Sequence, residues 1–122
     1  MLNVVCLQGR LTADPELKKA PAGDSVVSFS IAVPRSYVQK GKERVTDFFD
    51  IVAWRNTAEV ICKYMKKGSM LVLSGELQRR DYKGKDGTNK YKYEIICRDV
   101  HFVDRKLNEG DKESDDFSNM PF

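Results

Sequence analysis

The stretch TDFFDIVAWRNTAEV, residues 46–60, begins with the alternation of a strand and ends with the composition of a helix. Successive side chains of a strand point to opposite faces, so Phe49, Ile51 and Ala53 share one wholly apolar face that suits a protein core. The other face carries two large aromatic residues on either side of an acid and a small apolar residue: Phe48, Asp50, Val52 and Trp54.

Phe48 and Trp54 lie six residues apart on this second face, which corresponds to about 20 Å along a strand. Arg55 follows directly. Such a surface could stack flat, ring-shaped ligands. The alternative is that both aromatics pack into a second core face, as in strands that are buried on both sides.

The length of 122 residues predicts a single domain with one core, and 32% charged and 41% hydrophobic residues are typical of a soluble protein. No apolar run approaches the ~18–20 residues of a membrane span, so no membrane partner is expected. The N-terminal residues lack the basic region and cleavage site of a signal peptide. Cys6, Cys62 and Cys97 form no CxxC pair, and His101 has no second ligand nearby in sequence. We therefore expect three small buried hydrophobic residues in a reducing cytoplasm, and no metal site.

Charge is unevenly spread. Residues 107–122 contain one base and five acids, whereas residues 1–106 carry a net charge of +7. A basic body suggests a polyanionic partner, and an acidic tail suggests a different one, although solvated surface charge is the alternative.

Outward from the first stretch, alternation predicts strands at residues 2–11, 25–33, 70–77 and 93–103. In the strand at residues 2–11, one side carries Asn3, Val5, Leu7, Gly9 and Leu11. In the strand at residues 25–33, the inward side chains are Val27, Phe29, Ile31 and Val33. In the strand at residues 70–77, one face carries Leu71, Leu73, Gly75 and Leu77. A basic hairpin loop is expected at residues 35–44, and a second long basic hairpin is expected at residues 78–91, with Tyr82 in its arm and a turn at Lys85–Thr88. A helix over Thr57–Lys67 is expected to have Asn56 as its N-cap and Glu59 at N3, and Gly68 ends it.

Five short strands with a helix between the third and fourth predict an all-β protein: the OB-fold, a five-stranded Greek-key barrel. We assign residues 1–106 to this domain and residues 107–122 to a short disordered acidic tail.

No catalytic arrangement is evident, so an enzyme is not expected. The motifs GxSxG and HExxH are absent, and Asp47 and Asp50 point to opposite faces of their strand. The segment Lys83–Thr88 has glycines and lysines but lacks the spacing and the following helix of a phosphate-binding loop. We expect no cofactor.

Four aromatic residues have bases close by in sequence, the combination that a single-strand nucleic-acid binder needs. They are Tyr37, Phe48, Trp54 and Tyr82. The candidates for phosphate contact are Arg10, Arg35, Lys40, Lys42, Arg44, Arg55, Arg79, Arg80, Lys83 and Lys85. Stacking would bind bases regardless of sequence, while the cations follow the phosphates.

Several segments, in the right order, resemble the bacterial single-stranded DNA-binding protein (SSB) family. The similarity covers residues 2–105 and includes 5–11, 14–16, 27–33, 46–54, 58–60, 64–69 and 72–77. The resemblance implies a cytoplasmic, nucleoid-associated homo-oligomer, usually a tetramer, that coats single-stranded DNA during replication, recombination and repair. It places the four aromatics at stacking positions and the first strand at a subunit-pairing edge. Tyr37, Phe48 and Tyr82 stand where the family often has tryptophan.

The same resemblance assigns the tail to the docking of replication, repair and recombination proteins. The residues concerned are Asp115, Asp116, Met120, Pro121 and Phe122. Two departures predict weaker or sterically limited docking: Asn119 stands where the family favours an acid, and the linker is much shorter than in many relatives.

Two other functions are considered. One is an OB-fold module for RNA binding or protein recruitment. The other is a small nuclease, but the sequence shows no acidic cluster that could hold metal ions for cleavage. Asp50, an acid on a face expected to meet phosphates, has no role in the single-stranded DNA model.

Overall fold

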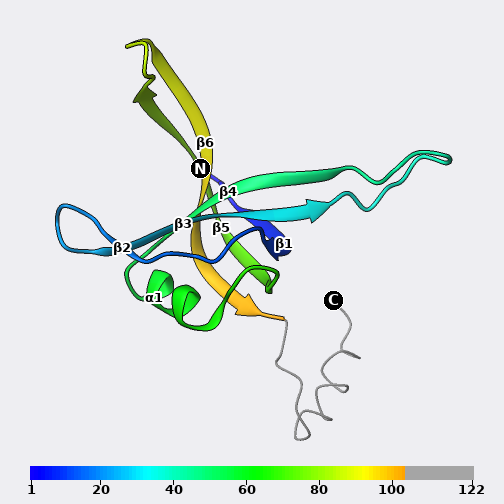
Figure 1. Ribbon diagram of the computed structural model, residues 1–122, viewed down its shortest axis with the longest axis horizontal. Coiled ribbons are helices and arrows are strands. Elements are labelled where there is room, and N and C mark those ends of the chain that lie inside the picture. The colour runs from blue at the N-terminus through cyan, green and yellow to red at the C-terminus, as the bar shows by residue number, and fades with distance from the viewer. Residues whose placement is uncertain (104–122) are drawn as a thin grey trace, which may run out of the picture.

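Six strands and one helix make up residues 1–103, the part of the chain that this computed structural model describes (Figure 1). In order they are β1 (Val5–Leu11), β2 (Lys18–Lys19), β3 (Ser25–Pro34), β4 (Thr46–Trp54), α1 (Arg55–Tyr64), β5 (Met70–Lys83) and β6 (Asn89–Phe102). The strands form one sheet in the order β1-β5-β6-β4-β3-β2, and a short β1–β3 pairing closes it into a barrel. The predicted OB-fold is confirmed, with the two-residue β2 as an unpredicted addition.

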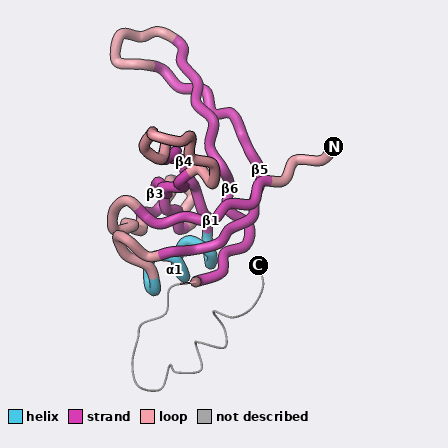
Figure 2. Tube along the Cα trace, turned by 90° about the vertical axis from the view of Figure 1, so that its right-hand side faces the viewer, coloured by secondary structure: helices cyan, strands magenta, loops and turns pink. Residues whose placement is uncertain are grey.

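The core consists of the inward positions of the barrel strands and one side of α1. Ile31, Ile51 and Leu71 are completely buried, and Ile61 of α1 joins them. The predicted inward face of β4 is therefore correct: Ile51 and Ala53 are buried, and Phe49 packs against the cluster. Figure 2 shows α1 at one end of the barrel, away from the projecting β5–β6 hairpin.

The predicted helix boundaries and cap are wrong. Helix α1 begins at Arg55, directly after β4, and Trp54 occupies the N-cap position without a side-chain hydrogen bond. Arg55 has a φ of 57°, in the left-handed region, and this residue makes the sharp corner from strand to helix. Glu59 does not cap the helix; its carboxylate accepts a hydrogen bond from Ser25 Oγ at 2.8 Å, which ties α1 to β3.

The helix also ends earlier than predicted. Met65, whose backbone is extended, is buried against the core, and its N–H donates to the Ile61 carbonyl at 2.9 Å. Lys66 and Lys67 therefore lie beyond the last helical turn, which contains Lys63 as its base.

The second basic hairpin is confirmed, and its arms form a two-stranded ribbon in which the strands continue beyond their predicted limits at Leu77 and Tyr93. Strands β5 and β6 each run for 14 residues, and pairing continues to Lys83 and Asn89 at the turn. In that turn the Asp86 carboxylate accepts hydrogen bonds from Thr88 N–H and Oγ1, at 3.1 and 2.7 Å, and these lower the pKa of Asp86. The ribbon projects well beyond the barrel (Figures 1 and 2). Leu77, predicted to share a face with Leu71 and Leu73, is exposed, whereas those two residues are buried.

A β-bulge marks the point where β5 passes from the barrel into the ribbon. The register with β6 shifts between Ser74 and Gly75. A Cβ atom at position 75 would lie 2.0 Å from the Ile96 carbonyl oxygen, so only glycine permits this approach of the two strands.

The three cysteines differ in burial. Cys97 is buried, and burial together with the nearby Asp99 charge raises its pKa to about 11. Cys62 is half-buried, and burial raises the pKa of its thiol as well. The prediction for Cys6 is wrong: it is exposed, because it occupies an outward position between Val5 and Leu7 of β1. Among residues 1–103, no helix is long and apolar enough to cross a bilayer.

Candidate nucleic-acid interface

The outward face of β4 carries the two aromatics singled out in the sequence. Phe48 is 66% exposed and Trp54 is 40% exposed, so neither packs into a second core. The sheet register places Phe48 beside Ala32 of β3, which in turn pairs with Arg10 of β1. These neighbours share one outward row, because residues directly opposite each other point to the same side of a sheet.

Trp54 borders a hollow of about 460 Å³ between β3, β4 and the base of the ribbon. Apolar side chains of Val26 and Val52 line its floor, and Arg80 and Glu94 line its far side. Glu94 is a buried acid that faces Arg80 Nη2 at 3.3 Å and Lys92 Nζ at 3.4 Å. Arg80 of the ribbon therefore lines the same hollow as the exposed indole, and Lys92 pairs with the same carboxylate.

Asp50 lies between the two aromatics. Its Oδ1 accepts a hydrogen bond from Ser30 Oγ at 2.9 Å, and its Oδ2 lies 3.9 Å from Lys92 Nζ. A smaller hollow of about 160 Å³ runs beside it, lined also by Ser28 and Glu94. The strand face is thus aromatic at two points and polar between them.

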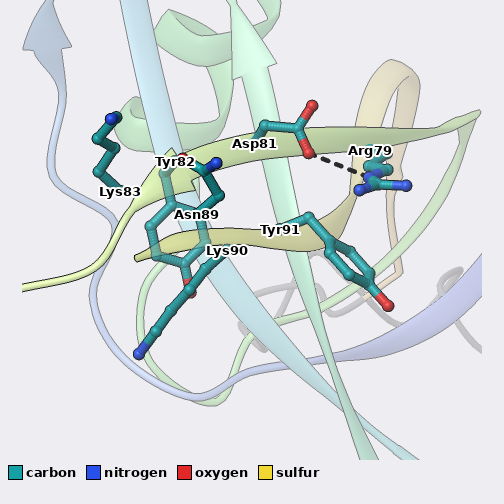
Figure 3. A pocket seen from close by; sticks show the side chains of 7 residues that line it. All are labelled: Arg79, Asp81, Tyr82, Lys83, Asn89, Lys90 and Tyr91. Carbon is teal, nitrogen blue, oxygen red and sulfur yellow. Dashed lines mark hydrogen bonds and ion pairs between the residues drawn. The ribbon is translucent and has the colours of Figure 1, made fainter. Parts of the chain in front are cut away.

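The ribbon extends the same face outward. Tyr82 of β5 pairs with Lys90 of β6, and Arg80 pairs with Lys92. Because alternate residues share a face, Arg80, Tyr82, Lys90 and Lys92 continue the side that bears Glu94. Tyr82 and Lys90 contribute to the wall of a hollow of about 500 Å³ near the ribbon tip, where Figure 3 shows both side chains.

The opposite face of the ribbon holds Arg79, whose contacts are already made. Its Nε lies 3.1 Å from Asp81 Oδ1, and its guanidinium lies 4.0 Å from the centre of the Tyr91 ring (Figure 3). Tyr91 and Tyr93 are both exposed, and their rings meet edge to face at 5.8 Å.

The hairpin between β3 and β4 carries Tyr37, which is 77% exposed. At its base Arg35 makes two hydrogen bonds to Asp47, at 2.9 and 3.2 Å, which lower the pKa of Asp47 and raise that of Arg35. Arg44 donates to the Arg35 carbonyl. This hairpin projects in a different direction from the ribbon, so Tyr37 and Tyr82 stand on separate arms (Figure 1).

The remaining predicted cations fall into two groups. Arg10 Nη1 donates to the Gly68 carbonyl at 2.7 Å, and Arg55 Nε lies 3.7 Å from Asp24 Oδ1. The others are exposed on the two arms: Lys40, Lys42, Lys83 and Lys85. The structure thus brings Phe48, Trp54, Arg80 and Arg10 onto the barrel face and its edge, while Tyr37 and Tyr82 lie on the arms.

Sequence reasoning missed Lys92, Tyr91 and Tyr93. The signal was present as alternation through residues 89–95, with Lys90, Lys92 and Glu94 on one side and the tyrosines on the other. The predicted fifth strand begins only at Tyr93, so the prediction assigned residues 89–92 to neither face of a strand.

The predicted tail sites lie outside the described residues. They are Asp115, Asp116, Met120, Pro121 and Phe122, together with the tail segment 107–122. Within residues 1–103, no three His, Cys, Asp or Glu side chains cluster closely enough to hold a metal ion.

The protein is a closed barrel of five strands, with a helix between the third and fourth of them and a hollowed aromatic face. These features define an OB-fold protein, a class that binds oligonucleotides or oligosaccharides on this face. The model of the single-strand binding protein family matches residues 2–103, and the chain belongs to this family.

Relatives and a solved structure agree with this assignment. The chain is 42% identical to the single-stranded DNA-binding protein of Oceanobacillus iheyensis, over 93% of this chain and 71% of that protein. It is 40% identical to the Bacillus cereus protein of the same name, over 99% of this chain and 71% of that protein. The structure is similar to that of the Plasmodium falciparum SSB complex with ssDNA, with a TM-score of 0.76 and 30% identity, covering 85% of this chain and 96% of the other.

Proposed function

We propose that this protein binds and protects single-stranded DNA during replication, recombination and repair. Binding does not require a particular base sequence. The observation that carries the proposal is the pair of exposed aromatics on β4, Phe48 and Trp54, beside the cations of the ribbon. Membership of the single-strand binding protein family and the names of the relatives support it.

Stacking supplies the tolerance of sequence, because every base presents a π-face. Phe48 and Trp54 form the central platform, and Tyr37 and Tyr82 extend it along the two arms. The exposure of Tyr37 in a polar hairpin supports its role, since packing against the core does not account for it.

Phosphates are neutralised by the arginines and lysines that surround these aromatics. Arg80, whose guanidinium is 3.3 Å from Glu94, lines the same hollow as Trp54, and Lys92 pairs with the same carboxylate at 3.4 Å. Further contacts come from the exposed lysines of the arms and from the arginines at their bases: Arg10, Arg35, Lys40, Lys42, Arg44, Arg55, Arg79, Lys83 and Lys85. Arg79 is the weakest member of this set, because Asp81 and Tyr91 already engage it.

Trp54 is the single tryptophan, so its fluorescence reports on the face directly. Oligothymidine should quench it, and the affinity should fall steeply as salt rises, because bound cations displace counterions from the phosphates. Equal affinity for duplex and single-stranded DNA would refute the proposal. Competition with RNA of the same length tests whether the 2′-hydroxyl matters.

The functional unit is a homo-oligomer, and we favour a tetramer. Two exposed apolar features support self-association: Leu2 and Val4 before β1, and Leu77 with Tyr93 on the ribbon. In addition, β1 pairs with β3 at Arg10 and Leu11, which leaves most of that strand edge open for a partner strand. Light scattering with and without a long oligonucleotide gives subunit number and stoichiometry together. A monomer at micromolar concentration would contradict this part.

We assign residues 1–106 to DNA binding and residues 107–122 to the recruitment of partner proteins. The net charge of the two segments supports the division, since an acidic segment does not favour DNA. Phe122→Ala should weaken capture of a purified repair or recombination protein and leave oligothymidine affinity unchanged. The protein acts in the cytoplasm on the nucleoid, without enzymatic activity or cofactor.

A further inference from the structure

Asp50 is the feature of the β4 face that single-stranded DNA binding does not explain. Its side chain lies on the same outward face of β4 as those of Phe48 and Trp54, because alternate residues of a strand share a face. A fixed negative charge there repels phosphates, so it should weaken the proposed function unless it makes a contact that compensates. The inference below rests on that proposed function.

The contacts of Asp50 within the protein do not require an acid. Its ion pair with Lys92 spans 3.9 Å, with side chains 52% and 38% exposed, and exposed pairs of this kind contribute little stability. Lys92 has a closer partner in Glu94, at 3.4 Å. Ser30 Oγ donates one hydrogen bond to Oδ1 and would find water if the carboxylate were removed.

The position of Asp50 favours a contact with a base. It follows Phe48 by two residues on one face, a separation of about 7 Å along the strand, so the edge of a base stacked on the Phe48 ring approaches the carboxylate. A carboxylate offers about four acceptor sites, and Ser30 uses one. The adjacent hollow of about 160 Å³ gives the base edge access, and Lys92, which also lines this hollow 3.9 Å from Asp50, supplies a donor.

We propose that Asp50 and Lys92 form a base-edge subsite beside Phe48, in which Asp50 accepts a hydrogen bond from an exocyclic amino group and Lys92 donates to the neighbouring ring acceptor. Cytosine presents this donor–acceptor pair through N4–H and N3, and adenine presents it through N6–H and N1. In the same pose thymine reverses this pattern, because its O4 oxygen faces the carboxylate and its N3–H faces the ammonium group of Lys92. The protein is therefore tolerant of sequence but favours cytosine over thymine at one position.

The test compares oligodeoxycytidine and oligothymidine of about eight nucleotides, within the site size of one OB-fold. Trp54 quenching gives the ratio of the two dissociation constants for the full chain. Asp50→Ala should lower the preference for cytosine about fivefold, the factor expected for one hydrogen bond. Asp50→Asn, which keeps the size and the Ser30 contact, should lower it partially.

Asp81→Ala is the matched control. It removes the same charge from an exposed acid on the opposite face of the ribbon and should leave the ratio unchanged. A second probe replaces each cytosine by pyrimidin-2-one, which lacks the 4-amino group; it should bind the wild-type protein less tightly and Asp50→Ala with affinity equal to that of cytosine.

The same ratio in wild type and Asp50→Ala would overturn the subsite, even if both oligomers bind tightly. Failure of every oligomer to quench Trp54 would instead refute single-stranded DNA binding itself. The two failures are therefore distinct.

Discussion

Phe48 and Trp54 combine two properties that a single residue rarely needs together: a large apolar ring and exposure to water. Phe48 lies outside the core, so its removal should not create a cavity. The structural and functional effects of substitution at this position are therefore separable.

We predict that Phe48→Ala weakens oligothymidine binding by about 1–3 kcal/mol, the contribution of one base–aromatic stack. Trp54 quenching measures the loss. Tyr64→Ala is the control, because Tyr64 is an exposed aromatic on α1 that contacts Phe102 and not the β4 face. A Phe48 variant with native affinity and native unfolding would remove this residue from the site.

Cys97 should be nearly inert in the folded protein. Its pKa of about 11 leaves little thiolate at pH 8, and the thiolate is the reactive form. In the variant Cys6→Ser/Cys62→Ser, where Cys97 is the single thiol, we predict that labelling with an aromatic disulfide is on the order of 100-fold slower than for an unfolded cysteine. Urea should restore the rate, and rapid labelling without urea would show that the thiol is accessible.

The raised pKa also has a consequence for stability. The pKa of Cys97 in the folded state lies above its unfolded value of about 8.5. The neutral thiol therefore makes its full contribution to the free energy of unfolding below about pH 8.5, and this contribution is lost as the pH rises toward 11. Unfolding midpoints of wild type and Cys97→Ala should therefore converge or cross in this range.

Among the elements, β5 and β6 show where sequence patterns were sufficient and where they failed. Alternation placed Leu71 and Leu73 on one face of the strand, and both residues are buried. It could not identify Leu77 as exposed, because Leu77 continues the same face and pairs with Ile95 of β6, which is buried. The alternation of residues along a strand shows which of them share a face, but it does not show whether another element covers that face.

Helix α1 failed for a different reason. A favourable capping residue, Asn56, was present, but the corner is made by the left-handed backbone of Arg55 and by the burial of Met65 at the other end. Both depend on tertiary packing. For the binding face, the sequence was enough for Phe48 and Trp54, whereas the contact of Asp50 with Ser30 needed the pairing of β3 with β4.

We predict that Gly75→Ala destabilises the protein by about 1–3 kcal/mol or more, the usual cost of overpacking, because the new Cβ would meet the backbone of β6. Urea unfolding provides the measurement. Ser74→Ala, on the other side of the bulge, is the control and should change the free energy of unfolding far less. Equal effects would mean that the close approach at Gly75 is relaxed by small shifts of the ribbon.

At the scale of the whole molecule, many basic residues near the candidate face already have acidic partners. Arg35 with Asp47 and Arg80 with Glu94 are examples. A phosphate must compete with these carboxylates, so the salt dependence of binding should reflect fewer phosphate contacts than the number of arginines and lysines suggests.

The exposed lysines of the hairpin between β3 and β4 should make a larger contribution to the salt dependence of binding. We predict that Lys40→Ala reduces the slope of log affinity against log salt by about 0.7, the value for one phosphate contact on a single strand. The control is Lys63→Ala on α1, where the lysine lies over the Tyr64 ring. An unchanged slope for Lys40→Ala would place this residue away from the DNA path.

The alternation of β4 has a consequence for how such a protein can change over evolutionary time. Substitutions at Phe48 or Asp50 alter ligand preference while Phe49 and Ile51 keep the barrel intact, so the two properties can drift separately. Insertions and deletions have no such freedom. A shift of one residue would exchange the two faces at once and send the core to solvent, so we expect point substitutions, and not length changes, to diversify this strand.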